Sequence, residues 1–334
     1  MQERRNIVFD VVTIGEGMLR LSPPRYERIR RARTLDLYVC GSQGNVASNI
    51  ARLGLKTAFI TKVPNNELGL LMKDHYTSCG VDASYIKLID NSRLGVNFIE
   101  FGATPRASKV VYDRKNSAAS TIAKGDFDFD KILKGVKLAY TDGIFPGLSE
   151  NCTEAALDFI AAAKRQGCKI AFDVNYREHL WSPERAREIQ SKIIKNIDIL
   201  ITTQWDSEIV FGYKGSYEDI IKQFYDEFGC KIVAITLREV YDVLRGAWNT
   251  MVLHEGKIIH GKKYDIDVID RFGAGDSWGS GFLYSYLTKG DVEFAANFGN
   301  ALCALHHTIP GDVAHVTVQE VMAIMNKKDF EVKR

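Results

Sequence analysis

Runs of apolar, often β-branched residues alternate along the chain with segments that repeat apolar residues every three or four positions. The runs predict buried strands at residues 7–14, 56–63, 136–141, 169–174, 197–202 and 231–236. The periodic segments predict helices at 45–53, 154–165, 276–288, 291–307 and 317–325, and Ser182-Pro183-Glu184 is a typical helix start. This alternation predicts an α/β fold with a mostly parallel central sheet and helices on both faces.

One part of the chain departs from this alternation. Residues 93–113 contain two extended runs around the turn Gly102-Ala103-Thr104-Pro105, with no helix between them. Together with residues 19–39, they predict a small antiparallel sheet outside the main one. Such a sheet would cover a substrate and exclude water, whereas the alternative is an ordinary surface hairpin. A further hairpin is predicted around Glu255-Gly256.

Composition narrows the class of protein. With 44 basic and 42 acidic residues among 334, the formal net charge of +2 gives no reason to expect a nucleic-acid partner. Six cysteines lie far apart without a C-x-x-C motif, which fits reduced thiols and a cytoplasmic location. The apolar stretch at residues 7–14 contains Asp10 and is too short for a signal peptide or a membrane span. We therefore expect a cytoplasmic protein with no membrane partner.

The strongest chemical signal is the glycine-rich segment Gly273-Ala274-Gly275-Asp276, which leads into a predicted helix. Such a turn presents several backbone N–H groups beside the positive end of the helix dipole, and this arrangement binds anions such as phosphate. A carboxylate next to bound polyphosphate is unfavourable unless it has a task, and Asp276 could take a proton from an attacking hydroxyl. The alternative is that Asp276 only caps its helix.

A dinucleotide-binding motif is a weaker interpretation of the amino-terminal region. Gly15-Glu16-Gly17 follows a predicted strand, as the glycines of such motifs do. Arg20, however, stands where the third glycine belongs, and Ser22-Pro23-Pro24 prevents an immediate helix. A nicotinamide-dependent dehydrogenase is therefore disfavoured.

Two separated segments together resemble the signatures of ribokinase-like (PfkB) carbohydrate kinases. Asp270–Asp276 is similar to the carboxyl-terminal signature of that family, and Gly41–Gly54 is similar to the amino-terminal one. The resemblance covers essentially the whole chain. It implies one ribokinase-like domain over residues 1–334, with a lid formed by about 19–39 and 93–113. It also implies ATP and Mg²⁺ as cofactors, and a homodimer formed through the lid.

Within the family, the sequence is most similar to 2-keto-3-deoxygluconate kinases. The similar stretches include Ser108–Arg114, Phe172–Arg177 and Ile309–Asp312. The resemblance implies Asp276 as the catalytic base and a set of sugar-acid-binding residues, namely Gly41, Ser42, Gln43, Gly44, Asn45, Tyr112, Arg114, Arg177 and Asp312. The implied ATP-binding residues are Asn175, Thr236, Arg238, Gly273, Ala274, Gly275 and Asn300, and Asp206 is the candidate metal ligand.

Several of these residues have a plainer interpretation. Arg114 and Arg177 suit a substrate carboxylate, because a guanidinium forms two parallel hydrogen bonds with it, but both could instead form salt bridges. Asn45 could cap its helix, Tyr112 could simply pack, and Asp312 could initiate a turn. The sequence also departs from the family pattern at several positions, including Cys40, Gln43, Asn97, Thr203–Asp206, Val240–Asp242 and Trp278.

The sequence thus predicts an ATP-dependent kinase that phosphorylates a sugar acid, 2-keto-3-deoxygluconate at its 6-hydroxyl, by direct in-line transfer. A kinase for a neutral sugar such as fructose or ribose is the first alternative. A catalytically silent sugar-binding protein of the same fold is the second, because fold alone does not fix function.

Overall fold

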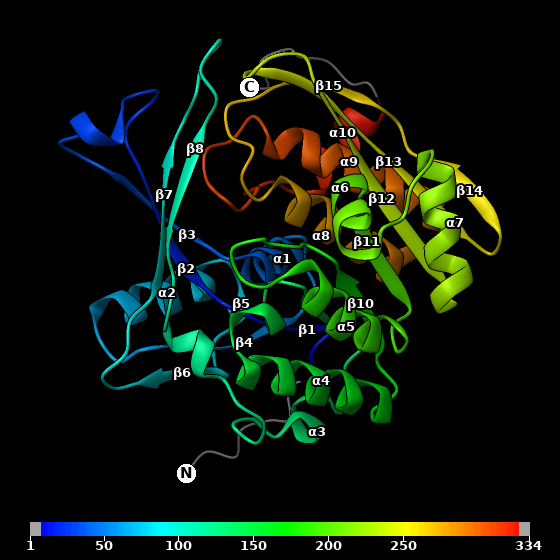
Figure 1. Cartoon of the computed structure of the whole chain (residues 1–334), viewed down its shortest axis with the longest axis horizontal. Coiled ribbons are helices and arrows are strands. Elements are labelled where there is room, and N and C mark those ends of the chain that lie inside the picture. The colour runs from blue at the N-terminus through cyan, green and yellow to red at the C-terminus, as the bar shows by residue number, and fades with distance from the viewer. Residues whose placement is uncertain (1–7, 327–334) are drawn as a thin grey trace.

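The computed structural model describes residues 8–326 and contains one large and one small sheet (Figure 1). The large sheet has eleven strands, in the order β14-β13-β12-β11-β10-β9-β1-β4-β5, with β6 beside β4 and β15 beside β13. Pairs among β1, β4, β5, β6, β9, β10, β11 and β12 are parallel, whereas β13, β14 and β15 pair antiparallel. The predicted mostly parallel sheet is confirmed. Its strands are β1 (Val11–Ile14), β4 (Thr57–Pro64), β5 (Val81–Asp82), β6 (Ile86–Ile89), β9 (Leu138–Asp142), β10 (Lys169–Asp173), β11 (Ile199–Thr203), β12 (Ile232–Val240), β13 (Arg245–His254), β14 (Lys257–His260) and β15 (Tyr264–Asp267).

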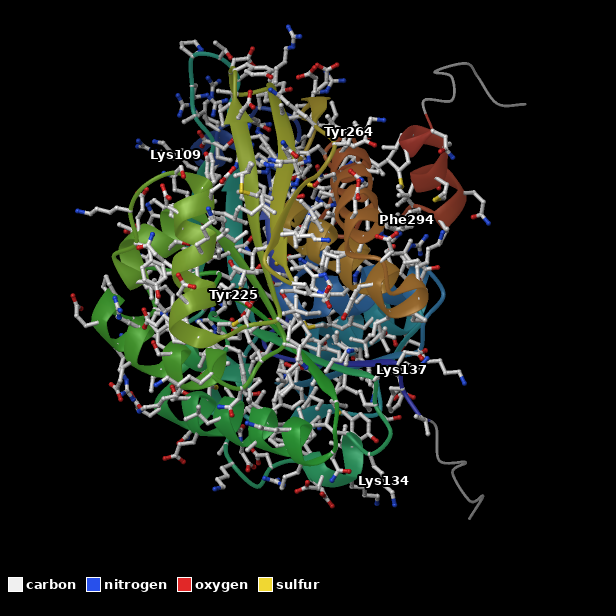
Figure 2. All side chains as sticks on the ribbon, turned by 90° about the vertical axis from the view of Figure 1, so that its right-hand side faces the viewer. Lys109, Lys134, Lys137, Tyr225, Tyr264 and Phe294 are labelled. Atoms are coloured by element: carbon white, nitrogen blue, oxygen red, sulfur yellow. The ribbon has the colours of Figure 1, made fainter. Side chains whose placement is uncertain are left out.

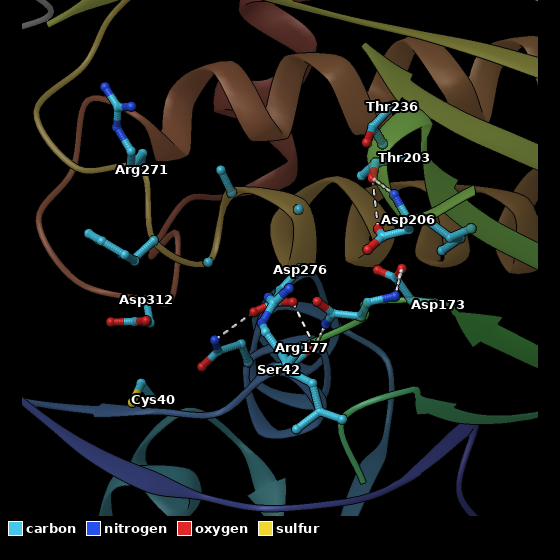
Figure 3. Close-up of a pocket in the computed structure, with 18 of the residues that line it drawn as sticks. Cys40, Ser42, Asp173, Arg177, Thr203, Asp206, Thr236, Arg271, Asp276 and Asp312 are labelled. Atoms are coloured by element: carbon cyan, nitrogen blue, oxygen red, sulfur yellow. Dashed lines mark hydrogen bonds between the residues drawn. The ribbon is translucent and has the colours of Figure 1, made fainter. Parts of the chain in front are cut away.

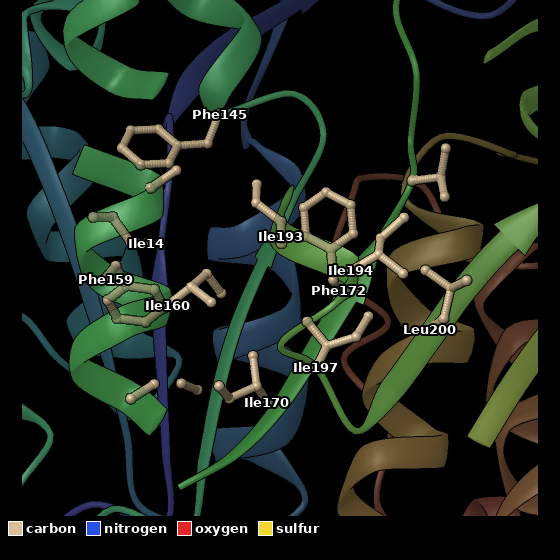
Figure 4. Packing of buried hydrophobic residues seen from close by; sticks show 14 of the residues in the cluster. Ile14, Phe145, Phe159, Ile160, Ile170, Phe172, Ile193, Ile194, Ile197 and Leu200 are labelled. Atoms are coloured by element: carbon tan, nitrogen blue, oxygen red, sulfur yellow. The ribbon is translucent and has the colours of Figure 1, made fainter. Parts of the chain in front are cut away.

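Helices cover both faces of the large sheet because its strands are apolar on both faces. Val12 and Ile14 of β1 pack in the cluster that holds Phe159 of α4, while Val11 packs in the opposite cluster with Phe282 of α8. Figure 4 shows the first of these clusters. The helices are α1 (Ser42–Arg52), α2 (Glu67–Ser78), α3 (Phe129–Ile132), α4 (Glu150–Arg165), α5 (Pro183–Ile194), α6 (Gln204–Asp206), α7 (Tyr217–Phe228), α8 (Ala274–Lys289), α9 (Val292–His306) and α10 (Val318–Met325), with short helical segments at Ile29–Arg31, Ala118–Thr121, Pro146–Leu148 and Ser207–Phe211.

Local sequence signals mark the start of one helix and the turn of one hairpin, as predicted. Ser182 caps α5 by accepting a hydrogen bond from the backbone N–H of Arg185, and Pro183 occupies the first turn. The hairpin between β13 and β14 turns at Glu255 and Gly256, both of which have positive φ angles of 49° and 74°. The prediction of that hairpin is confirmed.

The small sheet, which we call the lid, stands at the carboxyl ends of the parallel strands. It consists of β2 (Met18–Ser22), β3 (Asp36–Cys40), β7 (Gly95–Glu100) and β8 (Lys109–Asp113), in the order β3-β2-β7-β8. In Figure 2, Lys109 of the lid and Lys134, before β9, lie toward opposite ends of the molecule.

One detail of the predicted lid is wrong. The sheet is mixed rather than antiparallel, because β2 and β7 pair in parallel. Both strands leave the body at the same edge of the large sheet, β2 directly after β1 and β7 after β6, and therefore run in the same direction.

Two further features concern the whole described chain. None of the helices between residues 8 and 326 is both long enough and apolar enough to cross a membrane. All six cysteines lie in this part of the chain, where they are buried and unpaired.

Candidate active site

A cleft of about 790 Å³ lies between the lid and the carboxyl ends of β9, β10, β11 and β12 (Figure 3). The predicted site residues line it, with the exception of Gly44 and Asn300. Ser42 and Asn45, which are 234 and 231 positions before Asp276 in the sequence, thus meet it in one place, because α1 and α8 lie side by side against the same face of the sheet. The proximity of these residues is a structural finding, whereas their individual ligand contacts stay predictions.

Asp276 lies in the first turn of α8 and faces α1. Its Oδ1 accepts a hydrogen bond of 2.7 Å from Ser42 Oγ, and its Oδ2 accepts one of 2.7 Å from Asn45 Nδ2. The helix is capped by Gly273, without any side-chain hydrogen bond. Asp276 is therefore not a helix cap. Burial raises the pKa of its carboxyl group, an effect opposed by the Asn45 and Ser42 hydrogen bonds and by the positive charge of Arg177.

The turn before Asp276 is shaped to receive an anion. Gly273 has a φ of +80°, and a Cβ there would lie 2.4 Å from the carbonyl oxygen of Asp312. A Cβ on Gly275 would meet no atom within 4 Å, so this residue borders open space. The backbone N–H groups of Gly275 and Asp276 donate to no acceptor among residues 8–326. These free donors at a helix N-terminus are suited to phosphate oxygens.

The first turn of α1 forms the opposite wall. Its cap is Gly41, whose φ of +133° brings it so close to Glu16 that a Cβ would lie 2.2 Å from the Glu16 carbonyl oxygen. Asn45 is thus not a cap either. Gly44 lies on the other side of the helix, where a Cβ would lie 2.3 Å from the Tyr76 hydroxyl oxygen. Its predicted role in sugar binding gives way to close packing of α1 against α2.

Three carboxylates near the cleft, two of them buried and one partly buried, were not singled out from the sequence. Asp142 and Asp173 are the last residues of β9 and β10, and Glu16 follows β1. Asp142 accepts hydrogen bonds from Gln43 and, at 2.9 Å, from Asn175 Nδ2. Burial raises the pKa of Asp142 to about 6. The position of each residue at a carboxyl end of a predicted parallel strand was the available signal, because ligands bind at that edge.

Asp173 and Asp206 form the acidic end of the cleft beside Arg177 (Figure 3). The carboxylate of Asp206 accepts hydrogen bonds from Thr203 Oγ1 at 2.7 Å and from the Tyr176 backbone N–H at 3.1 Å. The pKa of Asp173 is raised well above its usual value by burial and then by the negative charges of Asp206, Asp142 and Asp276. Mutual repulsion of this kind is relieved by a cation. No group of three or more metal-ligating side chains is present in residues 8–326. The pair nevertheless fits Mg²⁺, which keeps several waters and takes only one or two protein carboxylates beside nucleotide phosphates.

At the lid end of the cleft, the predicted sugar-binding residues have different partners. Arg114 forms an ion pair with Glu16, which is only 1% exposed, through Nε and Nη2. Tyr112 is 41% exposed and borders the cleft rather than packing in a core. Asp312 accepts a hydrogen bond of 2.7 Å from Arg20 Nη1. Arg177, in contrast, forms no ion pair with a described carboxylate, and its Nη1 donates to the Tyr176 carbonyl oxygen.

Two arginines that line the cleft, Arg238 and Arg271, have no carboxylate partner in residues 8–326. The pKa of Arg238 is lowered by burial and by the like charge of Arg271. Neither arginine forms an ion pair within the described part of the chain, and Arg271 Nη2 donates to the Val243 carbonyl oxygen. Unpaired, mutually repelling cations at one place suit a polyanionic ligand.

Asn300 is a correction to the predicted ATP-binding set. Its side chain is fully buried, accepts hydrogen bonds from Thr250 Oγ1 and Trp278 Nε1, and donates to the Lys262 carbonyl oxygen. Trp278 explains this position, because its indole is the donor at 2.9 Å and stacks on Phe282 with ring centroids 5.1 Å apart. The departure from the family pattern at Trp278 thus ties Asn300 into the α8–α9 core and away from the cleft.

A family model for pfkB family carbohydrate kinases matches residues 8–316. The chain belongs to this family. It is a carbohydrate kinase, a phosphotransferase with an alcohol group as acceptor, and the cofactors of the family are ATP and Mg²⁺. The predictions of fold, enzyme class and cofactors are confirmed.

Individual relatives narrow the comparison. The chain is 33% identical over 325 residues to the 2-dehydro-3-deoxygalactonokinase of Haloferax volcanii, covering 97% of this chain and 99% of the relative. It is similar to the crystal structure of the 2-dehydro-3-deoxygluconokinase of Thermotoga maritima, with a TM-score of 0.91, 36% identity, and coverage of 95% and 99% of the two chains. A Clostridium botulinum 5-dehydro-2-deoxygluconokinase is 28% identical over 330 residues, covering 96% of this chain and 94% of the relative.

Proposed function

We propose that this kinase phosphorylates a 2-keto-3-deoxy sugar acid, 2-keto-3-deoxygluconate, at its terminal 6-hydroxyl. The observation that carries the proposal is the position of the Asp276 carboxylate, fixed by Ser42 and Asn45 next to the free N–H groups of Gly275 and Asp276. A proton acceptor and a phosphate cradle are thereby held side by side. The names of two relatives, a 2-dehydro-3-deoxygalactonokinase and a 2-dehydro-3-deoxygluconokinase, support the choice of acceptor.

The reaction is a single in-line displacement. The sugar 6-hydroxyl oxygen forms a bond with the γ-phosphorus of ATP while the bond from that phosphorus to the β–γ bridging oxygen breaks, which releases ADP. Asp276 accepts the hydroxyl proton. The backbone N–H groups of Gly275 and Asp276 stabilise the charge that develops on the phosphoryl oxygens. Mg²⁺, held through Asp173 and Asp206, would supply positive charge to the phosphates.

The cations of the cleft agree with two anionic ligands. Arg238 and Arg271 have no carboxylate partner in the described part of the chain and suit the nucleotide phosphates, while Arg177 lies between the Asp206 end and Asp276 (Figure 3). Arg114 is held by Glu16 through Nε and Nη2, which leaves Nη1 for the sugar carboxylate. Tyr112 and Asp312 border the same end and suit sugar hydroxyls.

A panel of acceptors tests this function. Purified enzyme is given ATP, Mg²⁺ and equal concentrations of 2-keto-3-deoxygluconate, 2-keto-3-deoxygalactonate, fructose or ribose, and ADP release is measured. We expect the sugar acids to give values of kcat/KM at least tenfold above those of the neutral sugars. A preference for fructose or ribose would overturn the acceptor class. Binding of sugar without any ADP release would favour the silent sugar-binding protein.

We also propose that a second copy of the chain covers the outer face of the lid. Arg20, Asn97 and Tyr112 are on the cleft side, so the residues next to them in each strand point the opposite way. One apolar residue from each strand forms a row across that outer face through the pairs Leu21–Leu37, Leu21–Phe98 and Phe98–Val111. Leu37 and Val111 are 44% and 55% exposed.

Light scattering of the purified protein tests this assembly. We expect a dimer for the wild type, and a monomer when Leu37→Lys and Val111→Lys are combined. The row contains no residue of the proposed phosphate cradle, so the monomer should still hydrolyse and transfer phosphate if it folds. A wild-type monomer at micromolar concentration would contradict the assembly.

A further inference from the structure

A buried arginine of the lid connects the lid to the turn that carries Asp276. Arg20 of β2 is 1% exposed. Its Nη1 donates a hydrogen bond of 2.7 Å to Asp312 Oδ2, and its Nη2 donates to Asp270 Oδ2. One guanidinium therefore holds two carboxylates that come from two different loops of the body. A planar guanidinium suits this task, since its donors point in fixed directions.

Aromatic rings enclose this guanidinium. The rings of Tyr38, Phe101 and Phe272 have their centroids 4.8, 5.2 and 5.3 Å from its central carbon. Tyr38 belongs to the lid, whereas Phe272 lies in the turn before α8 and packs edge-on against Phe101. The rings exclude water from the ion pairs and attract the cation through their faces. The cluster thus spans the contact between lid and body.

Asp270 also binds backbone N–H groups of the two loops that border the site. Its Oδ1 accepts a hydrogen bond of 3.0 Å from the Phe272 backbone N–H, and its Oδ2 accepts one of 3.0 Å from the Gly311 backbone N–H. Phe272 precedes Gly273, and Gly311 precedes Asp312. Asp270 therefore joins the phosphate turn to the loop that carries Asp312, in addition to its contact with Arg20.

The loop around Asp312 touches both the turn and the cleft. A Cβ on Gly273 would lie only 2.4 Å from the carbonyl oxygen of Asp312, so the loop packs directly against the turn. The side chain of Asp312 borders the cleft, and its Oδ1 accepts no hydrogen bond from residues 8–326. Arg20 thus fixes one carboxylate oxygen of Asp312 and leaves the other for a ligand.

We propose that Arg20 is a positioning residue of this kinase: it orients the Asp312 carboxylate toward the sugar and holds the lid strand β2 on the phosphate turn. The role of Asp312 as a sugar contact rests on the proposed function. Without the guanidinium, Asp270 and Asp312 are two unneutralised carboxylates that repel each other, and Asp312 turns away from the cleft or becomes protonated. Sugar binding then weakens more than nucleotide binding, since the cluster lies at the sugar end.

Steady-state kinetics of full-length variants test this role. For Arg20→Met, we expect the KM for the sugar to rise at least thirtyfold while the KM for ATP stays within threefold of the wild type. Arg20→Lys keeps the charge but has no fork to hold two carboxylates, and should raise the sugar KM by about tenfold. Arg28→Met is the matched control, because Arg28 pairs with Glu100 elsewhere on the lid and is 51% exposed. Both of its KM values should stay within twofold.

Folding is measured alongside the kinetics. If Arg20→Met does not fold, the double variant Arg20→Met/Asp270→Asn removes one carboxylate together with the cation and restores the charge balance. It should fold and still show the raised sugar KM. A sugar KM within threefold of the wild type in any folded variant lacking the Arg20 guanidinium would overturn the proposal, as would equal increases in both KM values.

The outcome is separable from that of the acceptor panel. If the wild type acts on a neutral sugar instead of a sugar acid, the proposed acceptor is wrong. The ratio of sugar KM to ATP KM is then measured with that sugar for the same variants. Arg20 keeps its role if the ratio rises in the Arg20 variants and not in Arg28→Met.

Discussion

The corner around Asp276 and the cluster around Arg20 share the turn from Asp270 to Asp276 but arrange their charges in opposite ways. In the Arg20 cluster, the cation is neutralised by protein carboxylates and enclosed by aromatic rings. At the corner, Arg177 and the N–H groups of Gly275 and Asp276 have no anionic partner among residues 8–326. Charges that the protein neutralises itself are structural, whereas charges left unneutralised beside a cleft await a ligand.

Replacement of the proposed base should give the largest effect on activity. We expect Asp276→Asn to lower kcat by about 10³-fold or more, since the amide cannot take the hydroxyl proton. Affinity for ATP, measured by titration, should stay within a few-fold, because the neighbouring N–H groups are unchanged. Turnover near that of the wild type would refute the base assignment.

Removal of a cation should have opposite consequences in the two regions. Arg20→Met leaves two buried carboxylates unpaired and should lower the free energy of unfolding by about 3–5 kcal/mol in urea titrations. Arg177→Met removes an exposed cation without a carboxylate partner and should change it by less than about 0.5 kcal/mol. In the same Arg177→Met variant, the KM for the sugar acid should rise at least tenfold. Equal stability losses in the two variants would contradict the distinction.

The pH dependence of stability should also separate the regions. Burial raises the pKa of Asp312 to about 7, so the folded state binds a proton that the unfolded state, with a pKa near 3.8, releases. This contribution to stability is complete below pH 4 and is lost as the pH rises through 7, at up to about 1.4 kcal/mol per pH unit.

Urea titrations from pH 4 to pH 8 measure this dependence. Asp312→Asn should flatten the decline in stability with rising pH. A part of the slope should remain, because Asp142 has a pKa of about 6 and acts in the same direction. A slope identical to that of the wild type would show that Asp312 does not titrate in this range.

The smallest expected effect concerns the lid wall between the two regions. Asn97 is 6% exposed and borders the cleft; its Nδ2 donates to Cys40 Sγ at 3.4 Å, and its Oδ1 has no partner in the described chain. An unsatisfied amide in a sugar site can recognise a hydroxyl. We expect Asn97→Leu to reduce the ratio of kcat/KM for 2-keto-3-deoxygluconate and its C4 epimer to within threefold.

A matched lid variant controls for packing. Ile99→Val changes the neighbour on the same face of β7 without altering any polar atom, and should leave the epimer ratio unchanged. Because Asn97→Leu removes an unsatisfied buried polar group, its unfolding midpoint should equal or exceed that of the wild type. If Asn97→Leu left the ratio of kcat/KM for the two epimers unaltered, this amide would not contribute to recognition of the sugar.

The sequence predicted those parts of the site that depend on neighbours along the chain. The turn Gly273–Asp276 is local, so its glycines and its carboxylate identified it, whereas the start of α1 was identified through its resemblance to the amino-terminal signature of the family. Asp142 and Asp173 were missed because their importance depends on which strands lie side by side. The position of Asn300 depended on the packing of Trp278 across two helices, which no local pattern records. Arg20 drew attention only as the residue that breaks a glycine motif, although its partners lie 250 and 292 residues away.

The attachment of β2 to the body limits how the cleft can admit its substrates. A hinge that lifted the whole small sheet would pull a guanidinium out from between two carboxylates and three rings. Strand β7 continues into Phe101 of the same cluster, whereas the edge strand β8 forms no ion pair with the body at its Lys109 end within residues 8–326. We therefore expect the sugar to enter the cleft beside the edge strand β8, past the half-exposed ring of Tyr112, without displacement of the whole lid.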